Sequence, residues 1–123
     1  MKKKILVIDD DENIRSLLSL ELSEIGYDVQ IASDADSGLL ILKKNLINLI
    51  ILDIKMPGMD GIEALEKIIC LKKELPVIIH SAYSHFKENY LTWGAVDYVL
   101  KSGNLKTLLD SIERHLSLSA LKI

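Results

Sequence analysis

The sequence predicts an α/β fold built on a parallel sheet, and two observations carry this prediction. Short apolar runs alternate with longer amphipathic stretches along the chain, and the runs have the composition of strands buried on both faces. The length of 123 residues and the hydrophobic content of 49% suit a single domain with a substantial core. The five expected strands are Ile5–Ile8, Val29–Ala32, Leu49–Leu52, Val77–Ile79 and Tyr98–Leu100.

The stretches that separate these runs predict helices, because their apolar residues recur at three- and four-residue intervals. Gly26 is a natural stop for the first helix, and Asn104 is a plausible N-cap for the last. Strands and helices alternate strictly, so we expect right-handed crossovers between parallel strands. The expected helices span residues 12–25, 35–46, 61–73, 83–93 and 104–117.

Composition excludes several classes of protein. The net charge is −3 and the lysines occur in small groups along the chain, which argues against the concentrated basic face of a nucleic-acid-binding protein. Cys70 is the single cysteine; it excludes an internal disulfide, fits a reducing cytoplasm and is expected to be a packed or half-packed helix residue. The first apolar run is too short for a secretory signal, and no apolar 18-mer predicts a membrane span.

Polar residues stand where several of the expected strands end. Asp9, Asp10 and Asp11 follow the first strand, and Asp53 follows the third. In open parallel sheets, ligands bind beyond the carboxyl ends of the strands, where the strand order reverses. For a strand order of 2-1-3-4-5, that point lies between the first and third strands and brings the aspartates together. His80 and Ser81 end the fourth strand, and Lys101 follows the fifth.

Each of these residues also has a simpler explanation. The first three aspartates could cap the following helix, and Asp53 could open an Asx-turn before Pro57. Ser81 and Lys101 could be ordinary strand-end and loop residues. Their gathering at one edge favours a site, because crowded carboxylates repel unless a cation joins them. Carboxylates are hard oxygen ligands suited to Mg²⁺, and no Cys/His spacing competes.

The sequence resembles the receiver domain of two-component response regulators, and the resemblance covers nearly the whole chain. It implies that residues 1–123 form a single receiver domain. The motifs that carry it are "ILVIDDDENIR" at 5–15, "LIILDIKMPGMDG" at 49–61, "PVIIHSA" at 76–82 and "GAVDYVLKS" at 94–102. The resemblance implies a flavodoxin-like, doubly wound five-stranded parallel sheet of order 2-1-3-4-5. It implies that Asp53 accepts a phosphoryl group from a phosphohistidine on a sensor histidine kinase.

The resemblance also assigns roles to the surrounding residues. Mg²⁺ would be held by Asp10, Asp53 and the backbone carbonyl of Lys55, with Asp9 acting mainly through a coordinated water. Ser81 would match the switch hydroxyl of the family, Tyr98 its switch aromatic residue and Lys101 its invariant lysine. Tyr98 would enter space that Ser81 vacates on phosphorylation.

The sequence departs from the family pattern in three places. Ser102 stands where the family usually has a proline after its lysine; because a non-proline cis bond costs about 2.5–4 kcal/mol, we expect a trans bond there. The spacing from Ser81 to Tyr98 is about two residues short, so the fourth helix or the loop before it must be trimmed. Lys55 and Tyr83 occupy positions that tune dephosphorylation in the family, and both could equally be solvated loop residues.

The favoured function is a phospho-switch that acts by binding partners. A sensor histidine kinase or phosphotransfer protein would act upstream, and an unknown output partner or effector domain downstream. This domain would contact neither nucleic acid nor membrane, would work in the cytoplasm, and would catalyse only its own phosphorylation and dephosphorylation. The output surface is expected over residues 83–93, Tyr98 and the last helix. Within it, Phe86, Tyr90 and Trp93 form one helical stripe that could instead pack on the sheet.

Two alternatives stay open. The chain could be the receiver fragment of a longer DNA-binding or enzymatic regulator. A phosphatase or flavin protein on the same fold is less favoured, because the glycine-rich phosphate loop of a nucleotide or flavin binder is absent. A haloacid-dehalogenase-type phosphatase would also want a second aspartate at the position of Lys55.

Overall fold

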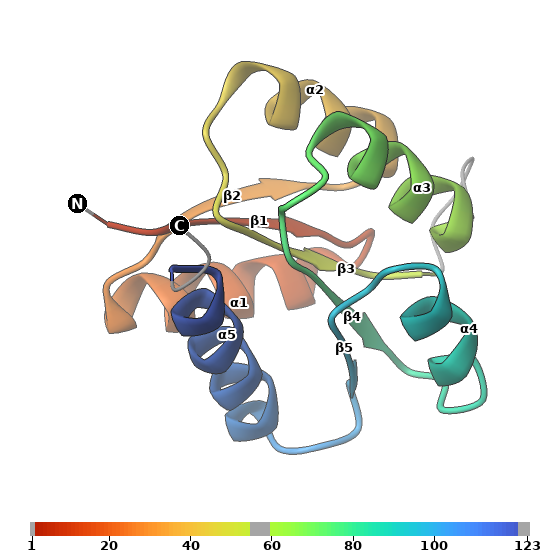
Figure 1. The fold of residues 1–123 in the computed structure, drawn as a ribbon. Helices are drawn as coiled ribbons and strands as arrows, with labels where there is room; N and C mark the ends of the chain where they lie inside the picture. The colour runs from red at the N-terminus through yellow and green to blue at the C-terminus, as the bar shows by residue number, and fades with distance from the viewer. Residues whose placement is uncertain (1, 55–59, 121–123) are drawn as a thin grey trace.

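The computed structural model describes residues 2–54 and 60–120, and its centre is a five-stranded parallel sheet (Figure 1). The strand order is β2-β1-β3-β4-β5, as the sequence predicts. Every neighbouring pair of strands is parallel, so all five carboxyl ends lie at one edge. The strands are β1 (Lys4–Ile8), β2 (Asp28–Ala32), β3 (Leu49–Leu52), β4 (Val77–Ser81) and β5 (Asp97–Leu100).

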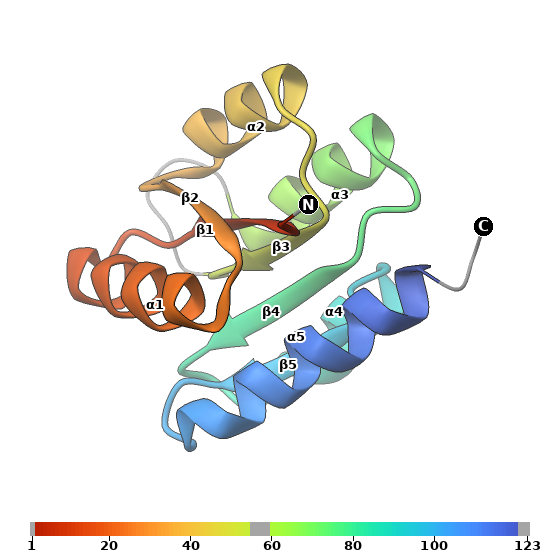
Figure 2. The ribbon, with the colours of Figure 1, turned by 90° about the vertical axis from the view of Figure 1, so that its left-hand side faces the viewer.

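Five helices cover the two faces of the sheet (Figures 1 and 2). Helices α1 and α5 pack on one face, whereas α2, α3 and α4 pack on the other. Alternate residues of the central strands face the two layers: Leu49 and Ile51 contact the first, and Ile50 and Leu52 the second. The helices are α1 (Glu12–Ile25), α2 (Ala35–Lys44), α3 (Gly61–Leu71), α4 (Lys87–Thr92) and α5 (Leu105–Ala120).

The register of the central strands places the two key acidic positions side by side. Ile8 at the end of β1 pairs with Leu52 of β3 on one side and with Ala32 of β2 on the other. The next residues continue the pairing, because the Asp53 N–H donates to the Ile8 carbonyl at 2.9 Å and the Asp9 N–H to the Ala32 carbonyl at 3.1 Å. Asp9 and Asp53 therefore leave adjacent strands at the same level.

The local signals at several helix ends are confirmed. Gly26 ends α1 in the left-handed region, at φ 117°, where a side chain would strain the backbone. Asn104 accepts a hydrogen bond from the Lys106 N–H at 2.9 Å, as an N-cap does. Helix α4 has six residues and is the shortest of the five described helices. Among the described residues no peptide bond is cis, and the Lys101–Ser102 bond is trans as predicted.

Two expectations are wrong. The second and fifth strands are not buried on both faces, because β2 and β5 are edge strands without a neighbour on their outer sides; Ile31 is 45% exposed and Leu100 is 36% exposed. Cys70 is exposed, because it lies on the outer side of α3, whereas Leu65 and Ile68 face the core. No helix in the described part of the chain is both long and apolar enough to cross a membrane.

Candidate functional site

Three carboxylates meet at the carboxyl edge of the sheet. Asp9 and Asp53 are buried, at 2% and 5% exposure, whereas Asp10 is exposed beside them. One oxygen from each of the three lies within 4.8 Å of the others. Acidic side chains are seldom buried unless a cation compensates their negative charge. We therefore expect a positively charged group close to these carboxylates.

Lys101 supplies part of that charge. Its Nζ lies 2.9 Å from Asp9 Oδ2 and 3.4 Å from Asp53 Oδ2, and its side chain is 19% exposed. Burial by itself would lower the pKa of Lys101, but the hydrogen bond to Asp9 and the negative charge of Asp53 outweigh burial, so the pKa is raised. The Lys101 N–H also donates to the Ser81 carbonyl at 2.7 Å, which ties the lysine to the end of β4.

The loop after β1 shows which aspartate caps the helix. Asp11 is the N-cap of α1, because its side chain accepts from the Asn13 N–H at 2.9 Å. Asp9 instead turns toward Lys101, while its second oxygen accepts from the Asp11 N–H at 2.9 Å. The capping alternative is therefore correct for Asp11, whereas Asp9 belongs to the acidic site. Arg15, which sequence reasoning missed, donates to the Asp9 carbonyl at 2.9 Å.

Ser81 and Tyr98 converge on one backbone group, the carbonyl of Tyr83. Ser81 is fully buried; its Oγ accepts from the Tyr83 N–H at 3.0 Å and lies 3.4 Å from the Tyr83 carbonyl. The Tyr98 hydroxyl donates to the same carbonyl, and its side chain is only 7% exposed. The Tyr98 side chain is therefore buried while the Ser81 hydroxyl still contacts Tyr83. The inward position of Tyr98 does not require Ser81 to move.

The other predicted positions are more peripheral. The Tyr83 ring is 37% exposed and meets the rings of His85 and Phe86 edge-on, each at a centroid distance of 6.1 Å. The helical stripe expected in this segment divides: Tyr90 is 5% exposed, whereas Phe86 and Trp93 flank α4 at 36% and 53% exposure. Lys55, expected both as a carbonyl ligand and as a tuning residue, lies outside the described residues.

His80 is a buried polar residue to which sequence reasoning gave no role. It is 6% exposed, and its Nδ1 makes no hydrogen bond within the described residues. Burial, followed by the positive charge of Lys101, lowers the pKa of His80 from its ordinary 6.5 to about 4. The imidazole is therefore neutral near pH 7. The sequence did contain a signal for this buried histidine, because His80 directly follows three aliphatic residues of β4.

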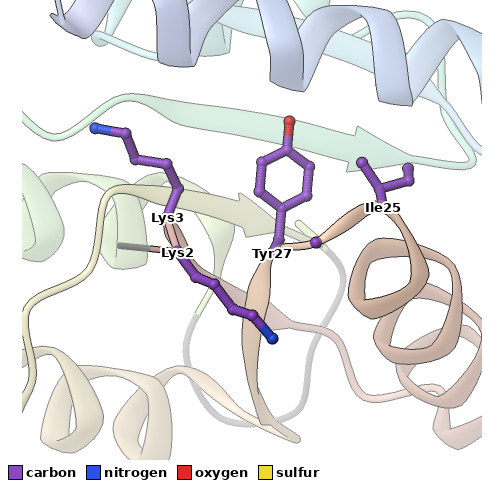
Figure 3. A pocket seen from close by; sticks show the side chains of 5 residues that line it. Lys2, Lys3, Ile25 and Tyr27 are labelled. Carbon is purple, nitrogen blue, oxygen red and sulfur yellow. The ribbon is translucent and has the colours of Figure 1, made fainter.

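The chemistry of the donor set suits a hard divalent cation. Three carboxylates offer oxygen ligands, and one exposed member leaves room for water, which Mg²⁺ retains. A pocket lies elsewhere, at the amino-terminal edge of the sheet, where Figure 3 shows the Tyr27 ring between Lys3 and Ile25. None of the three acidic residues lines that pocket.

The fold and this site together define an α/β signalling domain of the receiver class. Residues 5–113 match the family described as response regulator receiver domain. The chain is similar to sporulation initiation phosphotransferase F of Bacillus subtilis, with 32% identity over 98% of this chain and 98% of that protein. It therefore belongs to the response regulator receiver domain family, and it is a phospho-accepting receiver domain.

Two further comparisons extend the likeness. Probable transcriptional regulator ycf27 of Porphyridium aerugineum is 41% identical over 87% of this chain, which spans 45% of that longer protein. The crystal structure of response regulator TrrA from Thermotoga maritima, in complex with Mg²⁺-BeF, has a TM-score of 0.86 and 39% identity, covering 92% of this chain and 98% of that one. Receiver domains in general are signalling domains that interact with histidine kinases.

Proposed function

We propose that Asp53 is the residue that accepts the phosphoryl group. The observation that carries this proposal is a buried carboxylate at the end of β3, 3.4 Å from the ammonium group of Lys101 and next to two further carboxylates. A carboxylate in such a place costs free energy unless the site uses it. The site supplies what phosphoryl transfer needs, namely a positioned nucleophile and neighbouring positive charge.

In the proposed reaction, a carboxylate oxygen of Asp53 attacks the phosphorus of a phosphohistidine on the donor protein. The bond between phosphorus and the histidine nitrogen breaks, and that nitrogen keeps the electron pair. Lys101 stabilises the negative charge that develops on the phosphoryl oxygens. Asp9, Asp10 and Asp53 would hold Mg²⁺, together with the backbone carbonyl of Lys55. The bound ion would neutralise phosphoryl charge, and the Mg²⁺-BeF complex of TrrA supports this assignment.

Ser81 would donate its hydroxyl hydrogen bond to a phosphoryl oxygen. To do so, its Oγ must exchange the Tyr83 backbone for the new group, because that hydroxyl now contacts Tyr83. Tyr98 would act as the switch aromatic from its inward position. Tyr83, whose ring is partly exposed close in sequence to Ser81, would slow hydrolysis by shielding the phosphoryl group from water.

The proposed partners follow from this role. A sensor histidine kinase or phosphotransfer protein would donate the phosphoryl group, and residues 83–93 with Tyr98 and α5 would present the output surface. The chain would catalyse only its own phosphorylation and dephosphorylation, in the cytoplasm, without contacting nucleic acid or membrane itself. Because the ycf27 relative is a longer protein, the output partner could also be a domain of a longer regulator.

The test is intact-mass measurement after incubation with acetyl phosphate and Mg²⁺. The wild-type chain should gain the mass of one phosphoryl group, and Asp53→Asn should gain none. Asp36→Asn, an exposed aspartate on α2, is the matched control and should label fully. Undiminished labelling of Asp53→Asn would overturn the assignment. Steady consumption of the donor without any mass gain would favour the phosphatase alternative.

A further inference from the structure

Helix α4 is attached to the core through one side chain. All six of its residues are described, and Tyr90 is the buried one, at 5% exposure. No side chain caps its first turn, because Phe86 at the N-cap position makes no such hydrogen bond. A helix this short has little stability of its own. The position of α4 on the sheet therefore depends on where the Tyr90 ring is held.

The Tyr90 hydroxyl reaches the acidic edge of the sheet. A Cβ atom on Gly61 would overlap this hydroxyl oxygen and would lie 2.8 Å from the Ile54 Cα, so the hydroxyl and Ile54 both lie close against Gly61. Gly61 begins α3, and Ile54 directly follows Asp53. The hydroxyl thus lies close to the first residue of α3, beside Ile54.

The ring of Tyr90 also contacts the aromatic side chain of β5. The Tyr90 and Tyr98 rings lie 6.1 Å apart at an interplanar angle of 45°. Burial raises the pKa of Tyr90 to about 12, and the nearby carboxylates of Asp60 and Asp53 add to that rise. The Tyr90 hydroxyl therefore keeps its proton at neutral pH, and it interacts electrostatically with the Asp53 carboxylate.

We propose that Tyr90 is a positioning residue that couples the occupancy of Asp53 to the position of helix α4. This coupling would act beside the contacts of Ser81 and Tyr98 with Tyr83, and it rests on the proposed phosphorylation of Asp53. A phosphoryl group on Asp53 adds charge and volume to the residue that directly precedes Ile54, and Ile54 and the Tyr90 hydroxyl both lie close against Gly61. The hydroxyl responds to this change, and because Tyr90 is the one buried residue of α4, the helix moves with it.

Trp93 provides the reporter for this coupling. It is the single tryptophan of the chain, forms the C-cap of α4 and is 53% exposed. Its emission would be recorded on adding beryllofluoride with Mg²⁺, a phosphoryl mimic, to the wild type and to Tyr90→Phe. The substitution removes the hydroxyl and keeps the ring, so the fold should survive. Tyr27→Phe, a half-buried tyrosine at the opposite edge, is the matched control.

We expect a clear emission change in the wild type and in Tyr27→Phe, and loss of most of it in Tyr90→Phe. Intact mass should show that Tyr90→Phe still takes up the phosphoryl group, which separates coupling from phosphorylation. A full emission change in Tyr90→Phe would overturn the coupling. A wild type that neither labels nor responds would instead overturn the proposed function.

A second measurement uses the unaltered sequence and keeps the proposal testable if Tyr90→Phe folds poorly. The chain has four tyrosines, so 3-fluorotyrosine labelling gives four ¹⁹F positions; Phe variants of the other three tyrosines assign their resonances and leave that of Tyr90. The Tyr90 resonance should shift on adding beryllofluoride with Mg²⁺, and the Tyr27 resonance should stay. A stationary Tyr90 resonance would also overturn the coupling.

Discussion

Helices α3 and α4 lie on the same face of the sheet and are held there very differently. Helix α3 buries Gly61, Ala64, Leu65 and Ile68 along one stripe, and Asp60 caps its first turn by accepting from the Glu63 N–H at 2.9 Å. Helix α4 buries one residue and has no side-chain cap. Figure 1 shows the two helices on the same side of the sheet. Their buried residues and caps make α3 a firmly held element and α4 a loosely attached one.

The difference in burial between α3 and α4 indicates which helix can change its position at the smaller cost in free energy. Moving α3 would expose four buried positions, whereas moving α4 disturbs mainly the contacts of Tyr90. Elements that move in switching are drawn from the least stable parts of a fold. The contrast therefore fits the proposed coupling, in which α3 holds the site in place and α4 reports its state.

The largest expected effect comes from truncating one leucine in each helix. Leu65→Ala, at a fully buried position of α3, should lower the free energy of unfolding by about 2–5 kcal/mol, because it leaves a cavity. Leu91→Ala, at a 37% exposed position of α4, should change it by about 0.5 kcal/mol or less. Urea denaturation measures both values. Equal losses in the two variants would remove the contrast between the helices.

Strand β4 connects the segments of α3 and α4 in the chain, and it carries the buried residue His80. The pH dependence of stability tests whether His80 is held neutral there. The pKa of His80 is lowered from 6.5 to about 4, so between these values the unfolded chain binds more protons than the folded chain. Stability should therefore fall as the pH drops from above 6.5 toward 4, by on the order of 3 kcal/mol from this group. The measurement is the urea midpoint against pH. His80→Leu should show a shallower fall, and an unchanged slope would mean that His80 is not held neutral.

A smaller effect is expected from the cap of α3. Asp60→Ala removes the hydrogen bond to the Glu63 N–H and should cost about 1 kcal/mol. Glu88→Ala, an exposed acidic residue in the first turn of α4, is the control and should stay within about 0.5 kcal/mol. Thermal unfolding of both variants without Mg²⁺ gives the comparison. A loss in Glu88→Ala as large as that in Asp60→Ala would show that α4 is better anchored than its contacts indicate.

The elements could be predicted because their signals are local. Apolar runs, helical periodicity, Gly26 and Asn104 each act within a few residues, and the strand order then placed Asp9 beside Asp53. The exposure of β2 did have a signal in the sequence, because Gln30 interrupts its apolar run, whereas the four residues of central strand β3 are all aliphatic.

The contacts that distinguish this chain were not predictable because they join distant segments. Tyr90 meets Gly61 across 29 positions in the sequence, and helical spacing indicated only a stripe with Phe86 and Trp93. Tyr98 was expected to move inward on activation, yet it already contacts the Tyr83 carbonyl. Such outcomes depend on packing in three dimensions, and periodicity carries no information about them.

Hydrogen exchange followed by mass spectrometry tests the central contrast most directly. Peptides covering α3 and α4 would be compared with and without beryllofluoride and Mg²⁺, using Asp53→Asn as the control that cannot form the mimic. The amides of α3 should exchange slowly in both states. Those of α4 should exchange fast without the mimic and change their rate when it binds to the wild type. Equal protection of the two helices, or a change confined to α3, would contradict the account.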